Sequence, residues 1–214
     1  MSFKKNGFDT IKNAVNKDLA NFLFRYLKLR KEVLTHLQET RFISPYDEAQ
    51  GFFTDTQAPN TYSIYGDVAM EVVLSQIKSL VEKKTGIELV ETYSYARLYK
   101  KGDVLARHWD RESCKVSATV YLGGEPWSLY VNPTARKAQN GIKIDLEPGD
   151  ALVYKGDRLE HWREEFEGDI CGQVFFHYNE INSKRKYDTR AMLGLPAEFR
   201  AEDDPTTRIL RRKK

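Results

Sequence analysis

The chain has 214 residues, of which 30% are charged, and a formal net charge of +3. That length suits one sizeable core and is short for two independent domains. Its nearly balanced charges give no broad attraction to nucleic acid or to a membrane surface, and no apolar run approaches the length of a bilayer span. The two cysteines, Cys114 and Cys171, lie outside any C-x-x-C motif. Without a recognisable signal peptide, this predicts a reduced, cytoplasmic setting.

Residues 1–86 are predicted to form a helical support region. Apolar residues recur at helical spacing in two segments, and each segment follows a residue that caps helix N-termini well. Between the segments, a stretch rich in Pro, Gly, Asn and Asp predicts an ordered loop. In chain order we expect a short strand at 11–15, a helix from Lys17 to about Gln38 capped by Asn16, a loop at 41–65, and a helix capped by Asp67 that runs to about Lys84 and ends at Thr85-Gly86.

The pattern changes at Ile87, and residues 87–180 are predicted to form a β core. Eight short β-prone runs, separated by glycine-containing turns, favour a sandwich or jelly roll that the helices cover on one side. Residues 181–214 lose this regularity, so we expect an irregular C-terminal segment. The eight runs are 88–100, 104–109, 115–122, 127–132, 141–146, 150–155, 158–165 and 170–178.

A metal-binding pattern lies within this β-rich half. His108-Trp109-Asp110 is followed 53 residues later by His161, and the chain has only four histidines. Residues two apart on a strand point to the same side, so His108 and Asp110 can share one metal ion. A later strand must then supply the third ligand. Two histidines and one carboxylate form the facial triad that holds Fe(II) and leaves the opposite coordination positions open.

These motifs resemble those of the Fe(II)/2-oxoglutarate-dependent dioxygenases, and the prolyl 4-hydroxylase-like branch with its small bacterial and phage members is most similar. The resemblance covers about residues 88–180. It is carried by Arg97-Leu98-Tyr99-Lys100-Lys101-Gly102, by His108-Trp109-Asp110, by Pro148-Gly149-Asp150 and by His161-Trp162-Arg163.

The resemblance implies a mainly β protein, a double-stranded β-helix or jelly roll supported by N-terminal α-helices. It also implies Fe(II) held by His108, Asp110 and His161. The expected co-substrates are 2-oxoglutarate and O2, with ascorbate as a stimulating reductant. The expected reaction is hydroxylation of an unactivated C–H bond, coupled to decarboxylation of 2-oxoglutarate to succinate.

The same resemblance suggests which residues contact 2-oxoglutarate, and it exposes one departure. Tyr99 and Tyr121 occupy positions where the family often has tyrosines that bind this co-substrate. The family usually has an Arg or Lys about ten residues after the distal histidine, paired with the far carboxylate. Here that residue is Cys171. A buried carboxylate without a cationic partner is costly, so another base must replace it, or the co-substrate differs.

Three basic residues are candidates for that replacement. Arg97 is the first, because strand alternation places it on the same face as Tyr99. Arg163, two residues after His161, is the second, and Lys115 is the third. Alternation also places Cys171, Gln173, Phe175 and His177 on one face, so Gln173 is a further candidate for co-substrate binding. His177 is the rival for the third metal position, although we expect it to be a buried histidine with another role.

The first expected substrate, by analogy with the family, is a prolyl residue of a peptide or protein, followed by a small amino-acid-like molecule. A nucleic-acid demethylase of the alkylation-repair type shares some motifs, but the near-neutral composition disfavours a nucleic-acid partner. A third alternative is a cupin-like or non-catalytic metal-binding jelly roll, which the missing base at Cys171 would suit. The residues predict no membrane partner and leave the oligomeric state open.

Overall fold

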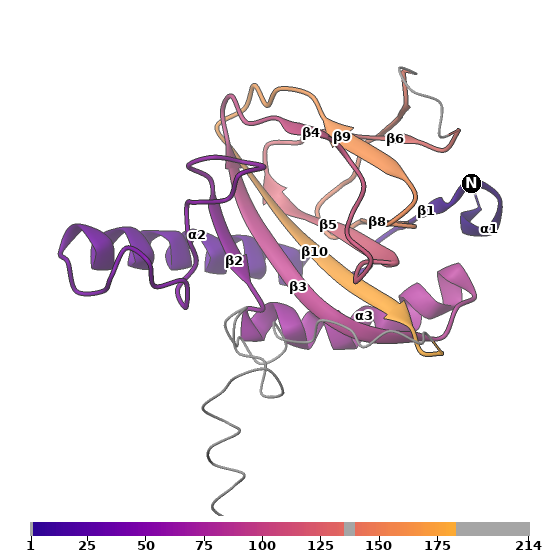
Figure 1. Ribbon diagram of the computed structural model, residues 1–214, viewed down its shortest axis with the longest axis horizontal. Helices are drawn as coiled ribbons and strands as arrows, with labels where there is room; N and C mark the ends of the chain where they lie inside the picture. Colours follow the sequence, from indigo (N-terminus) through magenta and orange to yellow (C-terminus); the bar gives the residue numbers. More distant parts are fainter. Residues whose placement is uncertain (1, 135–139, 183–214) are drawn as a thin grey trace, which may run out of the picture.

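The computed structural model describes residues 2–134 and 140–182. The basic tail at 208–214, nearly all of the predicted C-terminal segment and the centre of the polar loop at 132–142 lie outside these residues. Three helices and ten strands alternate along the described chain (Figure 1). They are α1 Phe3–Asn6, β1 Phe8–Ile11, α2 Lys17–Glu39, β2 Tyr62–Tyr65, α3 Val68–Thr85, β3 Leu89–Lys100, β4 Leu105–His108, β5 Val116–Gly124, β6 Leu129–Asn132, β7 Ile142–Ile144, β8 Ala151–Tyr154, β9 Glu160–Arg163 and β10 Ile170–Glu180.

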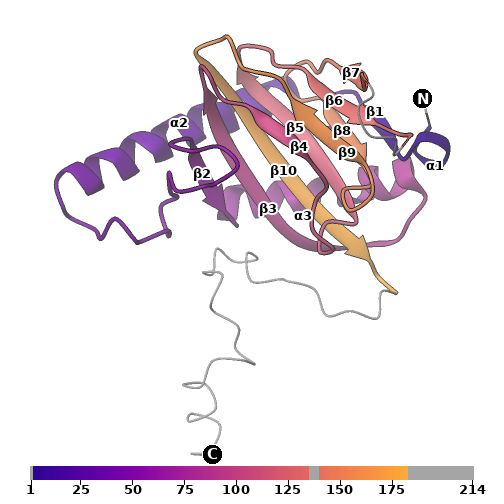
Figure 2. The same cartoon turned by 45° about the horizontal axis from the view of Figure 1, so that its top comes forward.

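The strands form two antiparallel sheets. The larger sheet has the order β1-β8-β5-β10-β3-β2, and the smaller has the order β4-β9-β6-β7. Figure 2 shows the smaller sheet lying in front of the larger one. Neighbours such as β5 and β10 are far apart in sequence, as a jelly roll requires. The predicted fold class, a jelly roll supported by helices, is therefore confirmed.

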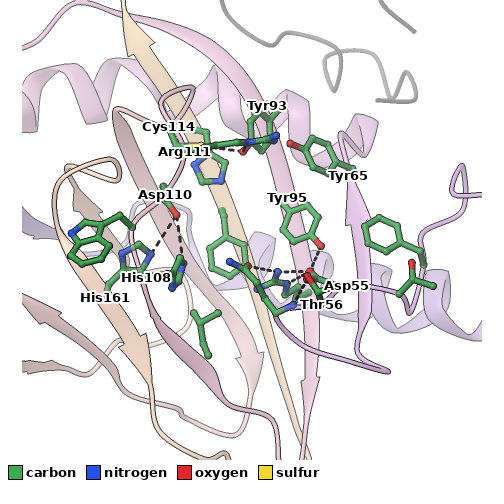
Figure 3. A pocket seen from close by; sticks show the side chains of 18 of the residues that line it. Asp55, Thr56, Tyr65, Tyr93, Tyr95, His108, Asp110, Arg111, Cys114 and His161 are labelled. Carbon is green, nitrogen blue, oxygen red and sulfur yellow. Dashed lines mark hydrogen bonds and ion pairs between the residues drawn. The ribbon is translucent and has the colours of Figure 1, made fainter. Parts of the chain in front are cut away.

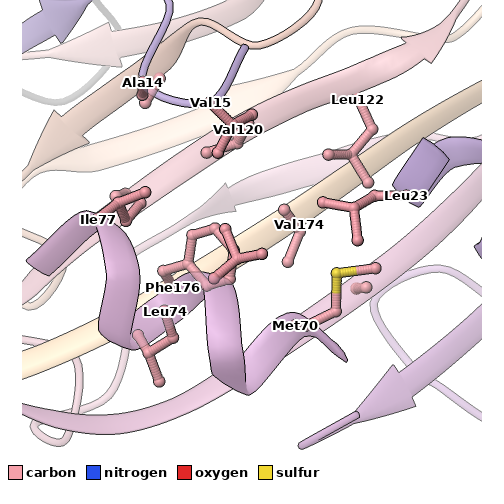
Figure 4. Packing of buried hydrophobic residues seen from close by; sticks show 14 of the residues in the cluster. Ala14, Val15, Leu23, Met70, Leu74, Ile77, Val120, Leu122, Val174 and Phe176 are labelled. Atoms are coloured by element: carbon pink, nitrogen blue, oxygen red, sulfur yellow. The ribbon is translucent and has the colours of Figure 1, made fainter. Parts of the chain in front are cut away.

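Helices α2 and α3 cover the outer face of the larger sheet (Figure 1). The predicted caps are confirmed: the Asn16 side chain accepts a hydrogen bond from the Leu19 backbone, and the Asp67 side chain accepts from Ala69 and Met70. Apolar side chains of both helices pack against β5 and β10 in the main core (Figure 4). The helices contribute Leu23, Met70, Leu74 and Ile77, and the strands contribute Val120, Leu122, Val174 and Phe176. No helix in the described ranges has both the length and the apolar character needed to cross a bilayer.

Strand β10 connects this core to the interior between the sheets. Val174 and Phe176 belong to the helix-side core, whereas Cys171 and Phe175 belong to a separate cluster on the other face. This alternation confirms the predicted shared face of Cys171, Gln173, Phe175 and His177. Gly172 faces α2, where an added Cβ would lie 2.5 Å from the Phe24 ring. The close helix contact thus fixes which face of β10 is turned toward the smaller sheet.

Two predictions in the N-terminal region were wrong. The strand expected at 11–15 is β1 at Phe8–Ile11, because the chain turns at Asn13, whose φ is 52°. The Asn13 backbone N–H donates to Asp150 at 3.0 Å instead of to a neighbouring strand. The loop expected at 41–65 contains the edge strand β2, which pairs with β3. Four residues are too few to give a clear periodic signal, so pairing with β3 determines this strand.

Candidate metal centre and pocket

The pairing of β4 with β9 brings the metal-binding motif together. His108 and His161 are direct partners in this antiparallel pair. Asp110 follows β4, and its backbone N–H donates to the Gly156 carbonyl at 2.9 Å. Asp110 Oδ1 lies 3.7 Å from His108 Nε2 and 3.5 Å from His161 Nε2. One ligand atom from each residue lies within 4.8 Å of the others, so the three side chains can hold a single ion.

Backbone hydrogen bonds orient both imidazole rings for metal binding. His108 Nδ1 lies 2.8 Å from the Ala106 carbonyl, and His161 Nδ1 lies 2.9 Å from the Leu159 carbonyl. A carbonyl only accepts, so each Nδ1 carries the proton and each Nε2 presents a lone pair. Burial, followed by the nearby His161, lowers the pKa of His108 and favours this neutral form. The donor set is therefore two imidazoles and one carboxylate, as Fe(II) in a facial triad requires.

The carboxylate of Asp110 is fixed by a second chain of hydrogen bonds. Ser117 Oγ donates to Asp110 Oδ2 at 2.7 Å, and His177 Nδ1 lies 2.9 Å from the same Ser117 oxygen. Burial alone would raise the pKa of Asp110, but His161, His177 and Ser117 more than offset it and hold the pKa well below its usual range. Asp110 is thus ionised. His177 lies behind the carboxylate and is not part of the triad cluster.

The triad opens into a cavity of about 600 Å³. Figure 3 shows the two histidines and Asp110 on one side of it, with Tyr95, Asp55 and Thr56 across from them. The volume falls within the range of about 300–1,000 Å³ that is typical of sites for small ligands. The wall is mixed, with tyrosines from β2 and β3, Phe175 and His177 from β10, and side chains of the loop before β2.

Arg163 is the most unusual charged residue near the triad. It is only 1% exposed, and its Nη1 donates to the Trp127 carbonyl. Its Nε has no hydrogen-bond partner, and no carboxylate in the described residues lies within ion-pairing distance. Burial lowers its pKa, while Cys171, Tyr99, Tyr154 and Tyr121 act in the opposite direction. A buried cation without an anion costs several kcal/mol, about what an incoming anionic ligand would recover.

The other residues predicted to bind the co-substrate surround Arg163. Tyr99 is fully buried, and its hydroxyl accepts from Arg97 at 3.0 Å. Tyr121 donates to the Gly124 carbonyl at 2.7 Å. Gln173 donates to the Cys171 sulfur at 3.2 Å, whereas its Oε1 has no partner. Burial raises the pKa of Cys171, which keeps this thiol neutral although Arg163 acts against the shift.

The first and third basic candidates already have carboxylate partners. Arg97 pairs with Asp55, donating from Nε at 2.9 Å and also from Nη2. The two side chains are 6% and 9% exposed, so this is a largely buried pair. Lys115 Nζ lies 3.8 Å from Asp157. Of the three bases, Arg163 is the one with a guanidinium that the described carboxylates leave uncompensated.

Sequence reasoning missed three residues of the site. Ser117 is on β5 and is separated from Asp110 by a turn, so only the fold brings them together. Tyr154 on β8 is buried, with its hydroxyl 3.4 Å from His161 Nε2. Asp55 comes from the long loop before β2. The alternation of side chains along β5 could have suggested that Ser117 faces the site. The loop that carries Asp55 has no periodic pattern that could have suggested the same of Asp55.

Known proteins share this architecture. No protein-family model matches the chain. Among curated proteins, a uridine-5'-phosphate dioxygenase from Amycolatopsis is 29% identical over 87 residues, which is 38% of this chain and 30% of that protein. A solved prolyl-4-hydroxylase from Pseudomonas putida superposes with a TM-score of 0.60 at 16% identity and covers 83% of this chain and 95% of its own. HygX from Streptomyces hygroscopicus, solved with nickel, 2-oxoglutarate and hygromycin B, gives a TM-score of 0.53 at 14% identity, covering 84% and 85%.

At these identities the structural likeness establishes the fold. The chain has the fold of the 2-oxoglutarate- and iron-dependent oxygenases, a class of oxidoreductases, and it carries a His-Asp-His cluster that could hold a metal ion. The predicted resemblance to this superfamily is confirmed. The curated relative is matched over less than a third of its length, so it gives this chain no substrate.

Proposed function

We propose that this protein is an Fe(II)- and 2-oxoglutarate-dependent dioxygenase that hydroxylates an unactivated C–H bond of a substrate bound in the 600 Å³ cavity. The observation that carries the proposal is the triad of His108, Asp110 and His161 beside a buried guanidinium without an anion. Bound iron and 2-oxoglutarate would supply the oxidising chemistry: 2-oxoglutarate and O2 yield succinate and CO2, and one oxygen atom enters the substrate as a hydroxyl group.

In this proposal Arg163 pairs with the far carboxylate of 2-oxoglutarate. The free Nε supplies a charged donor, and a guanidinium is suited to bidentate binding of a carboxylate. Tyr99, Tyr121 and Cys171 lie close enough to Arg163 to act on its charge, and the small Cys171 side chain leaves room that a longer residue would fill. Gln173, whose Oε1 has no partner, is a further polar group beside Cys171. Arg97 instead forms an ion pair with Asp55 and so holds the loop before β2. A non-catalytic jelly roll would have no use for an uncompensated buried cation, so this feature favours the enzyme.

The test combines a spectrum with a product assay. Purified apoprotein receives Fe(II) and 2-oxoglutarate without oxygen, and the visible charge-transfer band of the chelated complex is recorded. Oxygen is then admitted and succinate is measured. We expect the band and slow succinate release in the wild type, and neither in His108→Ala. Protein that binds Fe(II) but has no affinity for 2-oxoglutarate would overturn the proposal.

The substrate remains a prediction. Solved structures of this fold include a prolyl hydroxylase in complex with a peptide fragment and HygX with hygromycin B, so peptides and small molecules are both bound by relatives. The family resemblance predicts a prolyl residue as the substrate of this chain, and the product assay with a proline-rich peptide tests it.

A further inference from the structure

Aromatic rings line the cavity away from the triad. Tyr65 on β2 stacks on Tyr93 with ring centroids 4.7 Å apart, and its edge meets Tyr95 at 5.2 Å. Tyr93 in turn lies 4.6 Å from the ring of His177, and Tyr95 lies 6.3 Å from Phe175. All five residues line the cavity. Packed rings of this kind form a rigid apolar surface, which suits the face of a ring-shaped ligand.

Two cations already lie over these rings. The Arg97 guanidinium is 4.9 Å from the Tyr95 centroid and 5.9 Å from that of Phe175. The Arg111 guanidinium is 4.7 Å from Tyr93 and 5.6 Å from Tyr65. An aromatic wall can bind a cationic ligand through its ring faces, but here positive groups of the protein occupy that role. The wall therefore disfavours an ammonium-bearing substrate.

The hydrogen bonds around Ser117 determine what His177 offers to the cavity. Because Asp110 is ionised, the Ser117 hydroxyl donates to it, and Ser117 must then accept from His177 Nδ1–H. Burial lowers the pKa of His177 to about 4, so the ring is neutral at physiological pH. Its Nε2 is then a lone-pair acceptor, and no described residue donates to it. His177 Nε2 is thus a hydrogen-bond acceptor in the cavity that can bind an O–H or N–H group of a ligand.

A second polar atom in this region also lacks a hydrogen-bond partner. The Tyr65 hydroxyl is buried and has no hydrogen-bond partner among the described residues. Figure 3 shows Tyr65 beside Tyr93, on the side of the cavity away from the two histidine ligands. A buried hydroxyl without a partner costs roughly 1–3 kcal/mol, which a bound ligand that hydrogen-bonds to it would recover. Tyr65 and His177 both line the cavity, so His177 Nε2 and, once a ligand moves the side chains that cover it, Tyr65 Oη are two polar contact points between ring faces.

The loop before β2 closes one end of the cavity. Asp55 is bound by Arg97 and by the Tyr95 hydroxyl, and Thr54, Thr56, Gln57 and Glu48 line the same end. A free amino acid would leave most of the 600 Å³ empty.

Resting on the proposed oxygenase function, we infer that the substrate is a small, uncharged molecule with a hydroxylated ring, such as a nucleoside or a glycoside. Its ring packs on the tyrosines of β2 and β3. One of its hydroxyls donates to His177 Nε2 and another hydrogen-bonds to Tyr65 Oη. These contacts hold the ring on the tyrosine wall beside the triad, with one C–H bond toward His108 and His161.

The experiment measures substrate-stimulated succinate release and a product heavier by one oxygen atom. The probes are uridine, adenosine and a methyl glucoside, compared with hygromycin B, free proline and a proline-rich peptide. We expect a nucleoside or the glycoside to stimulate release and to be hydroxylated. Stimulation by the cationic or prolyl probes alone, or by none, overturns the inference. The anaerobic charge-transfer band is recorded in parallel. If the band forms but no ring-shaped probe is hydroxylated, the inference about the substrate is wrong and the proposed oxygenase function still stands.

Two variants test the contacts with the responsive probe. Tyr65→Phe keeps the ring and removes Oη, and His177→Asn keeps a donor for Ser117 but removes the acceptor in the cavity. For each we expect KM for the probe to rise about tenfold. In Tyr65→Phe, which leaves the hydrogen bonds of Asp110 intact, we expect the affinity for 2-oxoglutarate and the charge-transfer band to stay unchanged. Tyr46→Phe removes a hydroxyl from a residue that is 91% exposed and serves as the matched control. Unchanged KM in both pocket variants would contradict the assigned contacts.

Discussion

The guanidinium of Arg163 and the thiol of Cys171 are electrostatic neighbours, although they belong to strands of different sheets. Arg163 ends β9 of the smaller sheet, and Cys171 lies near the start of β10 in the larger one. The position where the family resemblance predicts a basic residue is thus small and neutral, and a cation enters the same region from the facing sheet. This arrangement leads to the first prediction.

Replacing Arg163 and Arg97 by methionine should have opposite effects on stability. Arg163→Met removes a buried charge without an anion, so we expect the free energy of unfolding of the apoprotein to stay level or rise by about 1 kcal/mol. Arg97→Met leaves Asp55 buried and unpaired, so we expect a loss of about 3 kcal/mol. Urea unfolding measures both. In contrast, the affinity for 2-oxoglutarate should fall about 100-fold in Arg163→Met. Loss of that affinity in Arg97→Met alone would make Arg97 the carboxylate partner.

Metal binding should depend on the triad and, less strongly, on Ser117. His161→Ala should abolish stoichiometric Fe(II) or Mn(II) binding in calorimetric titrations. Ser117→Ala keeps the three ligands but releases Asp110 Oδ2, so we expect affinity to fall about 10–100-fold. His36→Ala, an exposed histidine on α2, should bind metal as the wild type does. Equal affinities in the wild type and Ser117→Ala would show that this hydrogen bond does not orient the carboxylate.

Gly149 should tolerate no side chain. Its φ is 93°, and an added Cβ would lie 2.3 Å from the Val15 carbonyl oxygen. We expect Gly149→Ala to lower the free energy of unfolding by about 2–3 kcal/mol, the combined effect of backbone strain and displacement of the chain before α2. Gly102 has a φ of 83° with no atom within 4 Å of the added Cβ, so Gly102→Ala should cost about 1 kcal/mol. Equal losses would mean that strain alone acts at Gly149.

Stability of the metal-free protein should depend on His177 between pH 6.5 and about 4. Burial lowers the folded-state pKa of this residue from 6.5 to about 4. In that window the unfolded chain binds a proton that the folded protein does not, so stability falls as the pH decreases. The full effect is about 3 kcal/mol, complete below pH 4. Urea unfolding at pH 7 and 4.5 should show a larger loss for the wild type than for His177→Asn. Parallel losses would exclude His177 as the source.

Much of the site was predictable because it depends on local geometry. The i, i+2 spacing of His108 and Asp110 places both on one side of an extended chain, and the alternation of β10 places Gln173 and His177 on one face. The helix caps at Asn16 and Asp67 were equally local, since each side chain binds backbone groups within three residues. Such features follow from the backbone conformation of a few consecutive residues.

The rest depended on contacts between distant segments. Strand alternation favoured Arg97 over Arg163 as the carboxylate partner, and only the packing of the loop gives Arg97 its partner Asp55 and leaves Arg163 without one. The link from Asp110 through Ser117 to His177 includes a hydrogen bond between residues 60 positions apart, Ser117 and His177. The sequence by itself predicted the candidate metal-binding residues and determined the type of fold, through strand and helix periodicity. The tertiary structure decided which charges remain unpaired and which polar atoms face the cavity, because burial and partner choice are properties of the packed chain.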